Sequence, residues 1–231
     1  MILLCAATRM EMDACLGPLG EAFDSLPLGP RPWTRRRGGV LLAATGPGIP
    51  LTLARLMPLV MAERPSALVD IGIAGAYAGS GLSIGDLVAG ESEQFGDLGM
   101  ESPGPEAFLP IAGFDWSDPV YARPLALSTD PLGPLEPSGT VPAPKRTRGC
   151  TVNACTGTAA TGARRRSQTG ADFESMEGAA AALAGLEAGI PVAELRAISN
   201  AAADRDMRPE YIGLALRALG SFVSAWLERF A

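Results

Sequence analysis

Three polar side chains have types and positions that could do chemistry: Glu11, Glu177 in the segment SMEGAA, and Asn200 at the end of RAISN. The chain of 231 residues contains no histidine, so it lacks the usual general base and the commonest zinc ligand. Acid and base chemistry must therefore be carried out by carboxylates. No cysteine pair or carboxylate group has a spacing typical of a metal site, and we expect no metal.

Each of these side chains also has a plain structural explanation. Glu11 follows the first predicted strand, where open α/β sheets bind ligands, but a carboxylate there could simply favour a helix start. Glu177, expected early in an Ala-rich helix, would need polar partners if buried, and the vicinal hydroxyls of ribose could supply them. On the outer face of that helix it would only meet solvent. Asn200 ends a predicted strand and could equally form a turn.

Two glycine-rich segments follow predicted strands. GPGIPL at 46–51 begins like a dinucleotide-binding fingerprint but has Leu51 where the third glycine belongs, which argues against a Rossmann-type cofactor. GIAGAYAG at 72–79 has Gly72 and Gly75 at a strand end, where the backbone could closely approach a flat ligand. The same glycines could instead allow close packing of a neighbouring helix. We expect no bound cofactor.

The pattern of apolar residues predicts the elements that must position these side chains. Buried strands are expected at the N-terminus, at 40–45 and at 67–77, with a helix from Pro50 to Glu63 between the last two. Pro58 should kink or shorten this helix. Strand, helix and strand in this order predict a parallel α/β arrangement.

The second half of the chain is less regular. Between Pro103 and Pro144 it carries ten of its 20 prolines, which predicts loops and edge strands. Further on, the pattern predicts a helix over about 174–188, a strand over 192–198 and a C-terminal helix whose apolar stripe packs into the core. The two arginine runs, at 35–37 and 164–166, are expected in solvated loops.

The bulk composition limits the partners. With 47% apolar residues the chain can bury a sizeable core, and we assign residues 1–231 to one domain. A net charge of −6 argues against a nucleic-acid partner, whose phosphates call for clustered Lys and Arg. No apolar run is long enough to span a bilayer and no signal peptide is evident. We therefore expect a cytoplasmic protein with reduced cysteines and no membrane partner.

Taken in order, Glu11, GIAGA, SMEGAA and RAISN make the chain resemble the nucleoside phosphorylase and nucleosidase superfamily. The resemblance implies a single-domain three-layer α/β/α sandwich around a central mixed β-sheet. It also implies a hydrolase that cuts the bond between the base and the ribose of a small-molecule purine nucleoside. The superfamily is generally oligomeric, so a homo-oligomer, a dimer or a tetramer, is expected.

The resemblance further implies a role for each candidate residue. Glu11 would orient and deprotonate the attacking water, and Glu177 would hold the ribose together with Met176. Asn200 would face the N7 and O6 edge of the purine. The end of the glycine-rich strand would line the site, at Ile73, Ala74 and Gly75.

Asn200 departs from the methylthioadenosine nucleosidases, which have Asp at this position. An Asp carboxyl group can donate to N7 of adenine and accept from its amino group, whereas an amide NH2 can donate to both N7 and O6 of hypoxanthine. Asn200 therefore favours a 6-oxopurine nucleoside. Water and Asp204 are the candidate sources of the N7 proton, and Phe95, Asp97 or the proline-rich stretch could bind the 5′ substituent.

Three other functions stay open at this point. A phosphorylase would need arginines around its phosphate, and it is disfavoured by Asp70 and Ile71, near which related phosphorylases carry an Arg, although Arg9 keeps it open. A nucleosidase for methylthioadenosine or aminodeoxyfutalosine would call for Asp in place of Asn200. A non-catalytic nucleoside-binding protein would not need both Glu11 and Glu177.

Overall fold

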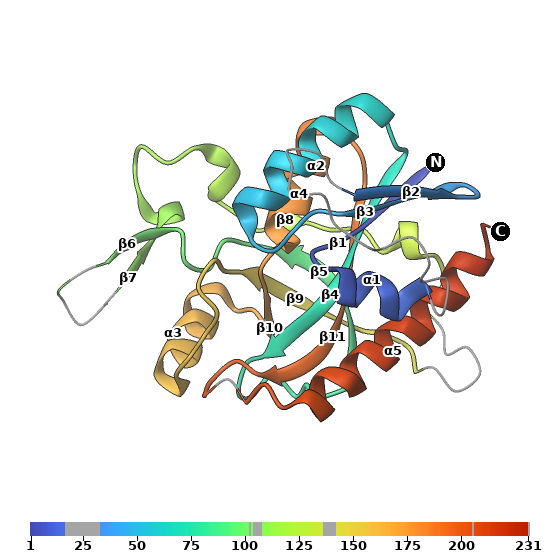
Figure 1. Ribbon diagram of the computed structural model, residues 1–231. Helices are drawn as coiled ribbons and strands as arrows, with labels where there is room; N and C mark the ends of the chain where they lie inside the picture. Colours follow the sequence, from blue (N-terminus) through green and yellow to red (C-terminus); the bar gives the residue numbers. More distant parts are fainter. Residues whose placement is uncertain (17–32, 102, 104–107, 136–141, 205, 231) are drawn as a thin grey trace.

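The computed structural model describes residues 1–16, 33–101, 103, 108–135, 142–204 and 206–230. Its centre is a mixed β-sheet with the strand order β10-β9-β5-β11-β4-β1-β3-β2 (Figure 1). The strands span β1 (Ile2–Ala6), β2 (Trp33–Arg37), β3 (Val40–Ala44), β4 (Ala67–Ala76), β5 (Leu87–Glu93), β9 (Lys145–Thr151), β10 (Phe173–Ser175) and β11 (Val192–Ala201).

The sheet contains both parallel and antiparallel pairings. Strand β1 is parallel to its neighbours β3 and β4, and β11 is parallel to β4. The pairs β2–β3, β5–β11 and β10–β4 are antiparallel. Because β10 pairs with both β9 and β4, the strands β4, β11, β5, β9 and β10 form a closed ring.

Helices cover both faces of the sheet, which confirms the expected three-layer α/β/α fold (Figure 1). On one face, alternate strand residues such as Leu4 and Ile71 pack against α1 (Arg9–Leu16) and α5 (Pro209–Glu228). On the other face, Leu3 and Leu68 pack against α2 (Ile49–Glu63) and α4 (Gly178–Ala188). This alternation is what strands buried on both sides require. A further helix, α3 (Ala159–Thr169), precedes β10.

The predicted elements of the first half are confirmed, with one difference in α2. The helix continues through Pro58 to Glu63 instead of ending early. Pro58 is exposed, and so is Ala54, whose carbonyl would have accepted the missing N–H. Solvent can satisfy that carbonyl, so the proline is tolerated.

Two other predictions are wrong, one for the second half and one for both halves of the chain. The helix expected from 174 begins only at Gly178, because 173–175 forms strand β10 between β9 and β4. The arginine runs do not lie in loops: 35–37 belongs to β2 and 164–166 to α3. Arg165 is buried at the inner face of α3, where its guanidinium group has acidic partners.

The proline-rich stretch has the predicted character in its described part, where short strands and 3-10 turns occur and no α-helix does. Strands β6 (Gly99–Glu101) and β7 (Phe108–Pro110) form a separate hairpin-like sheet, and β8 (Leu125–Ala126) pairs with β5. Within the described residues, no helix is long and apolar enough to cross a membrane. One domain over 1–231 stays a prediction, since part of that range lies outside the described residues.

Candidate active site

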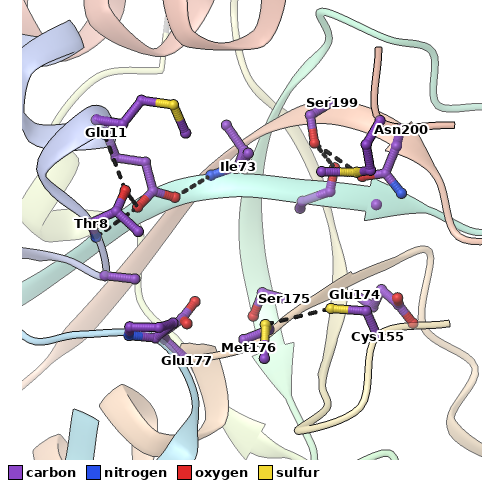
Figure 2. A pocket seen from close by; sticks show the side chains of 16 residues that line it. Thr8, Glu11, Ile73, Cys155, Glu174, Ser175, Met176, Glu177, Ser199 and Asn200 are labelled. Carbon is purple, nitrogen blue, oxygen red and sulfur yellow. Dashed lines mark hydrogen bonds between the residues drawn. The ribbon is translucent and has the colours of Figure 1, made fainter. Parts of the chain in front are cut away.

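A pocket lies beyond the carboxyl ends of the parallel strands β1 and β3, along the last residues of β4 and β11. Open α/β sheets bind ligands at this edge. All seven predicted site residues line the pocket: Glu11, Ile73, Ala74, Gly75, Met176, Glu177 and Asn200. Glu11 and Glu177 lie at one end, the Glu11 end, and Asn200 lies with Glu174 at the other, the Asn200 end (Figure 2).

Glu11 is held by three donors at the start of α1. Its Oε2 accepts the Thr8 backbone N–H at 2.9 Å and the Thr8 hydroxyl at 2.6 Å, and its Oε1 accepts the Ile73 N–H at 3.0 Å. The side chain is 4% exposed. Its position in the first helical turn follows the sequence prediction, and the bond to Ile73 ties it to the end of β4. A carboxylate fixed in this way still has free acceptor sites toward the pocket.

Glu177 is the N-cap residue of α4, and not a residue of its first turn. Its Oε1 accepts the N–H of Gly48 at 2.9 Å. Gly48 has φ 85°, which favours glycine, so the GPG turn at 46–48 serves to present this N–H. Burial and the nearby Glu11 raise the pKa of Glu177, while Arg196, Gly48 and the Met176 N–H oppose the shift.

Behind the Glu11 end lies a buried ionic cluster that the sequence did not predict. Arg196, fully buried on β11, binds Asp70, donates from Nε to Glu194 at 2.8 Å and lies 3.8 Å from Oε2 of Glu177. Burial would lower the pKa of Arg196, but these three carboxylates raise it and keep the guanidinium charged. Burial also raises the pKa of Asp70 to about 7, although Arg196 opposes this shift.

Gly72 serves this cluster and not a ligand, contrary to the expectation that its backbone would meet a flat ring. A Cβ at this position would clash with Nη1 of Arg196 and lie 2.7 Å from Oε1 of Glu11. Gly72 is absent from the pocket lining, whereas Gly75 is part of it. The first glycine of GIAGA therefore lets the arginine and Glu11 approach each other.

Asn200 is held by its own neighbours in the chain. The Ser199 hydroxyl lies 3.0 Å from Oδ1 of Asn200, and Nδ2 donates to the Ala201 carbonyl at 2.8 Å. One N–H of the amide is thus used, so only the second can donate to a ligand. The NH2 group can therefore donate to N7 or to O6 of the base, but not to both as predicted.

Glu174 is the charged residue of the pocket lining that the sequence analysis missed, because it was assigned to a helix. It is 6% exposed. Its Oε1 accepts the Thr156 N–H at 2.8 Å, and its Oε2 accepts the hydroxyls of Thr156 at 2.5 Å and Tyr77 at 2.9 Å. Arg165 lies 3.5 Å from Oε2. The alternation of polar and apolar residues in ADFES, 171–175, was the available sign of a strand.

Other residues that the sequence suggested lie elsewhere. Asp204 is exposed and does not line the pocket. Arg9 forms an ion pair with Asp13 along α1. Asp97 accepts the N–H groups of Asn153 and Ala154, and Phe95 packs against Tyr121 beside a separate hollow.

The pocket lining contains no Lys or Arg among the described residues. Within those residues no group of three or more His, Cys, Asp or Glu could hold a metal ion. None of the four cysteines forms a disulfide, and Cys155 lies at the pocket with its Sγ 3.4 Å from Sδ of Met176.

The α/β/α fold thus places a carboxylate-lined pocket at the strand ends, where α/β proteins of this class bind their ligands. Residues 12–230 match the family described as the phosphorylase superfamily. The chain belongs to this superfamily.

Two curated relatives give a more specific similarity than the superfamily match. The chain is 36% identical over 155 residues to a futalosine hydrolase of Acidothermus cellulolyticus, and 37% identical over 158 residues to one of Streptomyces coelicolor. These matches cover 67% and 68% of the chain but only 61% and 63% of the relatives, so the chain spans less than two thirds of their lengths. They agree with the superfamily that the sequence motifs indicate, and both of these relatives are futalosine hydrolases.

A solved structure supports the fold alone. A Helicobacter pylori nucleosidase with 5′-methylthioadenosine in its active site has a TM-score of 0.75 to this chain and 18% sequence identity. The similarity covers 99% of this chain and 98% of that one. The mixed sheet and the order of the elements are therefore those of the nucleosidase fold.

Proposed function

We propose that the chain is an N-ribosyl hydrolase that cleaves futalosine to hypoxanthine and dehypoxanthine futalosine, a step of menaquinone biosynthesis. The observation that carries this proposal is one pocket with the two carboxylates Glu11 and Glu177 at one end and the amide of Asn200 at the other. The two curated relatives named futalosine hydrolase support the choice of substrate.

The ribose would bind at the Glu11 end, with its 2′ and 3′ hydroxyls on Glu177. The two carboxylate oxygens offer roughly four acceptor sites. The N–H groups of Gly48 and Met176 use two of them, which leaves sites for both hydroxyls. Met176 and Ile73 would pack against the apolar side of the sugar, since both line the pocket at this end (Figure 2).

Bond cleavage leaves positive charge on C1′ as the base departs. Glu177 and Glu11 are both buried carboxylates, and their negative charge would stabilise such an oxocarbenium-like sugar. Glu11 would hold the attacking water and take its proton, since its three protein donors fix the carboxylate and leave acceptor sites. The oxygen of this water then bonds to C1′.

At the Asn200 end, the remaining N–H of Asn200 would donate to the purine edge, on N7 or O6 of hypoxanthine. An amide is not a proton donor of useful acidity, so we propose that water supplies the N7 proton. Asp204 is a poor alternative because it is exposed and outside the pocket lining.

Phosphorolysis is the second candidate, and the charge of the pocket argues against it. A phosphate at the Glu11 end would meet two carboxylates, and the described lining offers no Lys or Arg. Arg196, the nearest buried cation, is already bound by Asp70 and Glu194. Water carries no charge and meets no such repulsion.

We also propose that the protein is a cytoplasmic homo-oligomer. Met10 lines the mouth of the pocket and is 47% exposed, so an apolar side chain is left for a neighbouring subunit to cover. Light scattering over a range of concentrations tests this, and a monomer at all concentrations would contradict it.

The proposed activity is tested by incubating the purified chain with futalosine, inosine and methylthioadenosine, each with and without phosphate. We expect hypoxanthine from futalosine at a rate that phosphate does not change, with a free sugar hydroxyl in the product. A sugar 1-phosphate would identify a phosphorylase. Adenine from methylthioadenosine as the fastest product would identify an adenine nucleosidase, and no base release from any substrate would leave a binding protein.

A further inference from the structure

We infer that Glu174 determines the specificity of the pocket for a 6-oxopurine, by accepting a hydrogen bond from N1–H of the base. This inference rests on the proposed function, because it assigns a residue to the base of the proposed substrate. It concerns a side chain at the Asn200 end that has no part in the cleavage chemistry described above.

The sheet places Glu174 and Asn200 on either side of one glycine. Gly75 of β4 pairs with Glu174 of β10 on one edge and with Asn200 of β11 on the other. In-register neighbours point their side chains to the same face, and two strand spacings separate them by roughly 10 Å. Because the residue between them has no side chain, the amide of Asn200 can lie over it, and both Asn200 and Glu174 line the pocket that a flat base would enter.

Packing on the opposite face confirms which way these side chains point. Ala76 and Phe173, which directly adjoin Gly75 and Glu174, form an apolar cluster with Ile198, and the bulge between Ile198 and Asn200 places Ile198 on the face opposite to Asn200. A Cβ at Gly75 would lie 3.0 Å from Nδ2 of Asn200, on the pocket side. Tyr77, two residues beyond Gly75, donates to Glu174 on that same side.

Glu174 is also held as an acceptor. Two hydroxyls and Arg165 surround its Oε2, while its Oε1 accepts only the N–H of Thr156. The Oε1 atom therefore keeps an acceptor site. All four of these protein groups are donors to the carboxylate, so Glu174 acts here as an acceptor.

The edge of hypoxanthine matches this pair of groups, and the edge of adenine does not. Hypoxanthine has the acceptors N7 and O6 followed by the donor N1–H. An amide N–H from Asn200 and a carboxylate oxygen from Glu174 satisfy O6 and N1–H in that order. Adenine has an amino donor followed by the acceptor N1, whose lone pair would face the carboxylate and leave both groups unpaired.

The decisive measurement compares the binding of free bases, since it does not require turnover. Calorimetry with hypoxanthine and with 1-deazahypoxanthine, in which C–H replaces N1–H at nearly the same size, isolates this one hydrogen bond. We expect the wild type to bind hypoxanthine at least about tenfold more tightly. Equal affinities would overturn the inference, whether or not the chain hydrolyses futalosine.

The variant Glu174→Gln tests the residue itself. Its amide can turn its NH2 group toward the base, so the preference for hypoxanthine over 1-deazahypoxanthine and over adenine should each fall by about tenfold. The matched control is Tyr77→Phe, which removes a donor to Glu174 but keeps its carboxylate, and should keep both preferences. If the Glu174→Gln protein is less stable but keeps both preferences, then Glu174 serves only as a counter-ion for Arg165.

The two proposals fail in distinguishable ways. If wild-type protein releases no base from futalosine but still prefers hypoxanthine to 1-deazahypoxanthine, the proposed hydrolase activity is wrong and the specificity of the pocket stands. If it releases hypoxanthine but shows no such preference, only the role of Glu174 is wrong. If Glu174→Gln does not fold, the comparison of the two bases on the wild type decides alone.

Discussion

Both ends of the pocket contain buried carboxylates, but the surrounding residues neutralise the negative charge to different extents. At the Glu11 end, Glu177 shares the single cation Arg196 with Asp70 and Glu194, so negative charge is in excess. At the Asn200 end, Glu174 shares Arg165 only with Asp97 and has three further donors, and the neighbouring Asn200 is neutral. An excess of negative charge suits a sugar that becomes cationic, whereas a fixed set of donors and acceptors suits the recognition of a neutral base.

The largest effect should come from the Glu11 end. Glu11→Gln removes the proposed acceptor of the water proton and keeps one oxygen, which can serve the Thr8 donors or the Ile73 N–H but not both, so kcat should fall by about 10² to 10⁴. Binding of futalosine should change little, as measured by calorimetry. If the variant kept more than a tenth of wild-type kcat, Glu11 could not be the base.

The control for this variant is a residue away from both ends of the pocket. Glu91→Gln makes the same chemical change on β5, where Glu91 is exposed and outside the pocket lining. It should leave both kcat and binding unchanged.

The next effect concerns stability and compares the two buried arginines. Arg196→Met leaves Asp70, Glu177 and Glu194 without their cation, and removal of one partner of a buried ion pair costs about 3 to 5 kcal/mol. Arg165→Met should cost less, because Glu174 keeps the hydroxyl and N–H donors of Thr156 and Tyr77. Urea unfolding of both variants measures the difference, and equal losses would contradict the proposed difference between the ends.

The sequence predicted the Glu11 end better than the Asn200 end, for a physical reason. Glu11 follows a buried strand and begins a helix, and Glu177 lies close to an Ala-rich helix, so short-range patterns place both of them. Glu174 lies on a three-residue strand, β10, which exists because β9 and β4 pair with it from distant parts of the chain. The alternation in ADFES is the only local sign of this strand, and it is too short to distinguish the strand from the start of the helix that follows.

The sequence analysis did not predict the buried charges at either end of the pocket, and the reason is the same at both ends. Arg196 and Glu194 alternate with apolar residues in RAISN and its flank, which allowed a strand to be predicted but not the burial of the charges. Their partner Asp70 is on another strand, and the partners of Arg165 are Asp97 and Glu174. Ion pairs between different segments depend on the fold. The charge pattern of one segment therefore cannot predict them.

A smaller effect is expected for Asn200→Asp, which changes the Asn200 end without changing its shape. A protonated carboxyl can donate to N7 and accept from the amino group of adenine, so the ratio of kcat/KM for futalosine over methylthioadenosine should fall by about tenfold or more. Ser199 should still hold the new side chain, because its hydroxyl donates to the same oxygen. An unchanged ratio would show that Asn200 does not read the base.

The smallest expected effect tests whether Glu93 adds to the excess of negative charge behind the Glu11 end. Glu93 is fully buried on β5 beside Glu194, and its Oε2 accepts the Thr151 hydroxyl at 2.8 Å. Burial and the charge of Glu194 raise the pKa of Glu93 well above its ordinary value of 4.5, so the folded protein keeps a proton there to a higher pH than the unfolded chain does.

The unfolded chain releases this proton once the pH exceeds its ordinary pKa, so the contribution of Glu93 to stability is lost as the pH rises toward its folded pKa. The loss is at most about 1.4 kcal/mol for each pH unit. Glu93→Gln cannot ionise and can still donate to Glu194, so its free energy of unfolding relative to wild type should rise between pH 5 and pH 8. Urea unfolding across this range measures the slope, with Glu91→Gln as the exposed control on the same strand. A difference that does not depend on pH would mean that Glu93 is ionised in the folded state, and the negative excess behind Glu177 would then be larger by one charge.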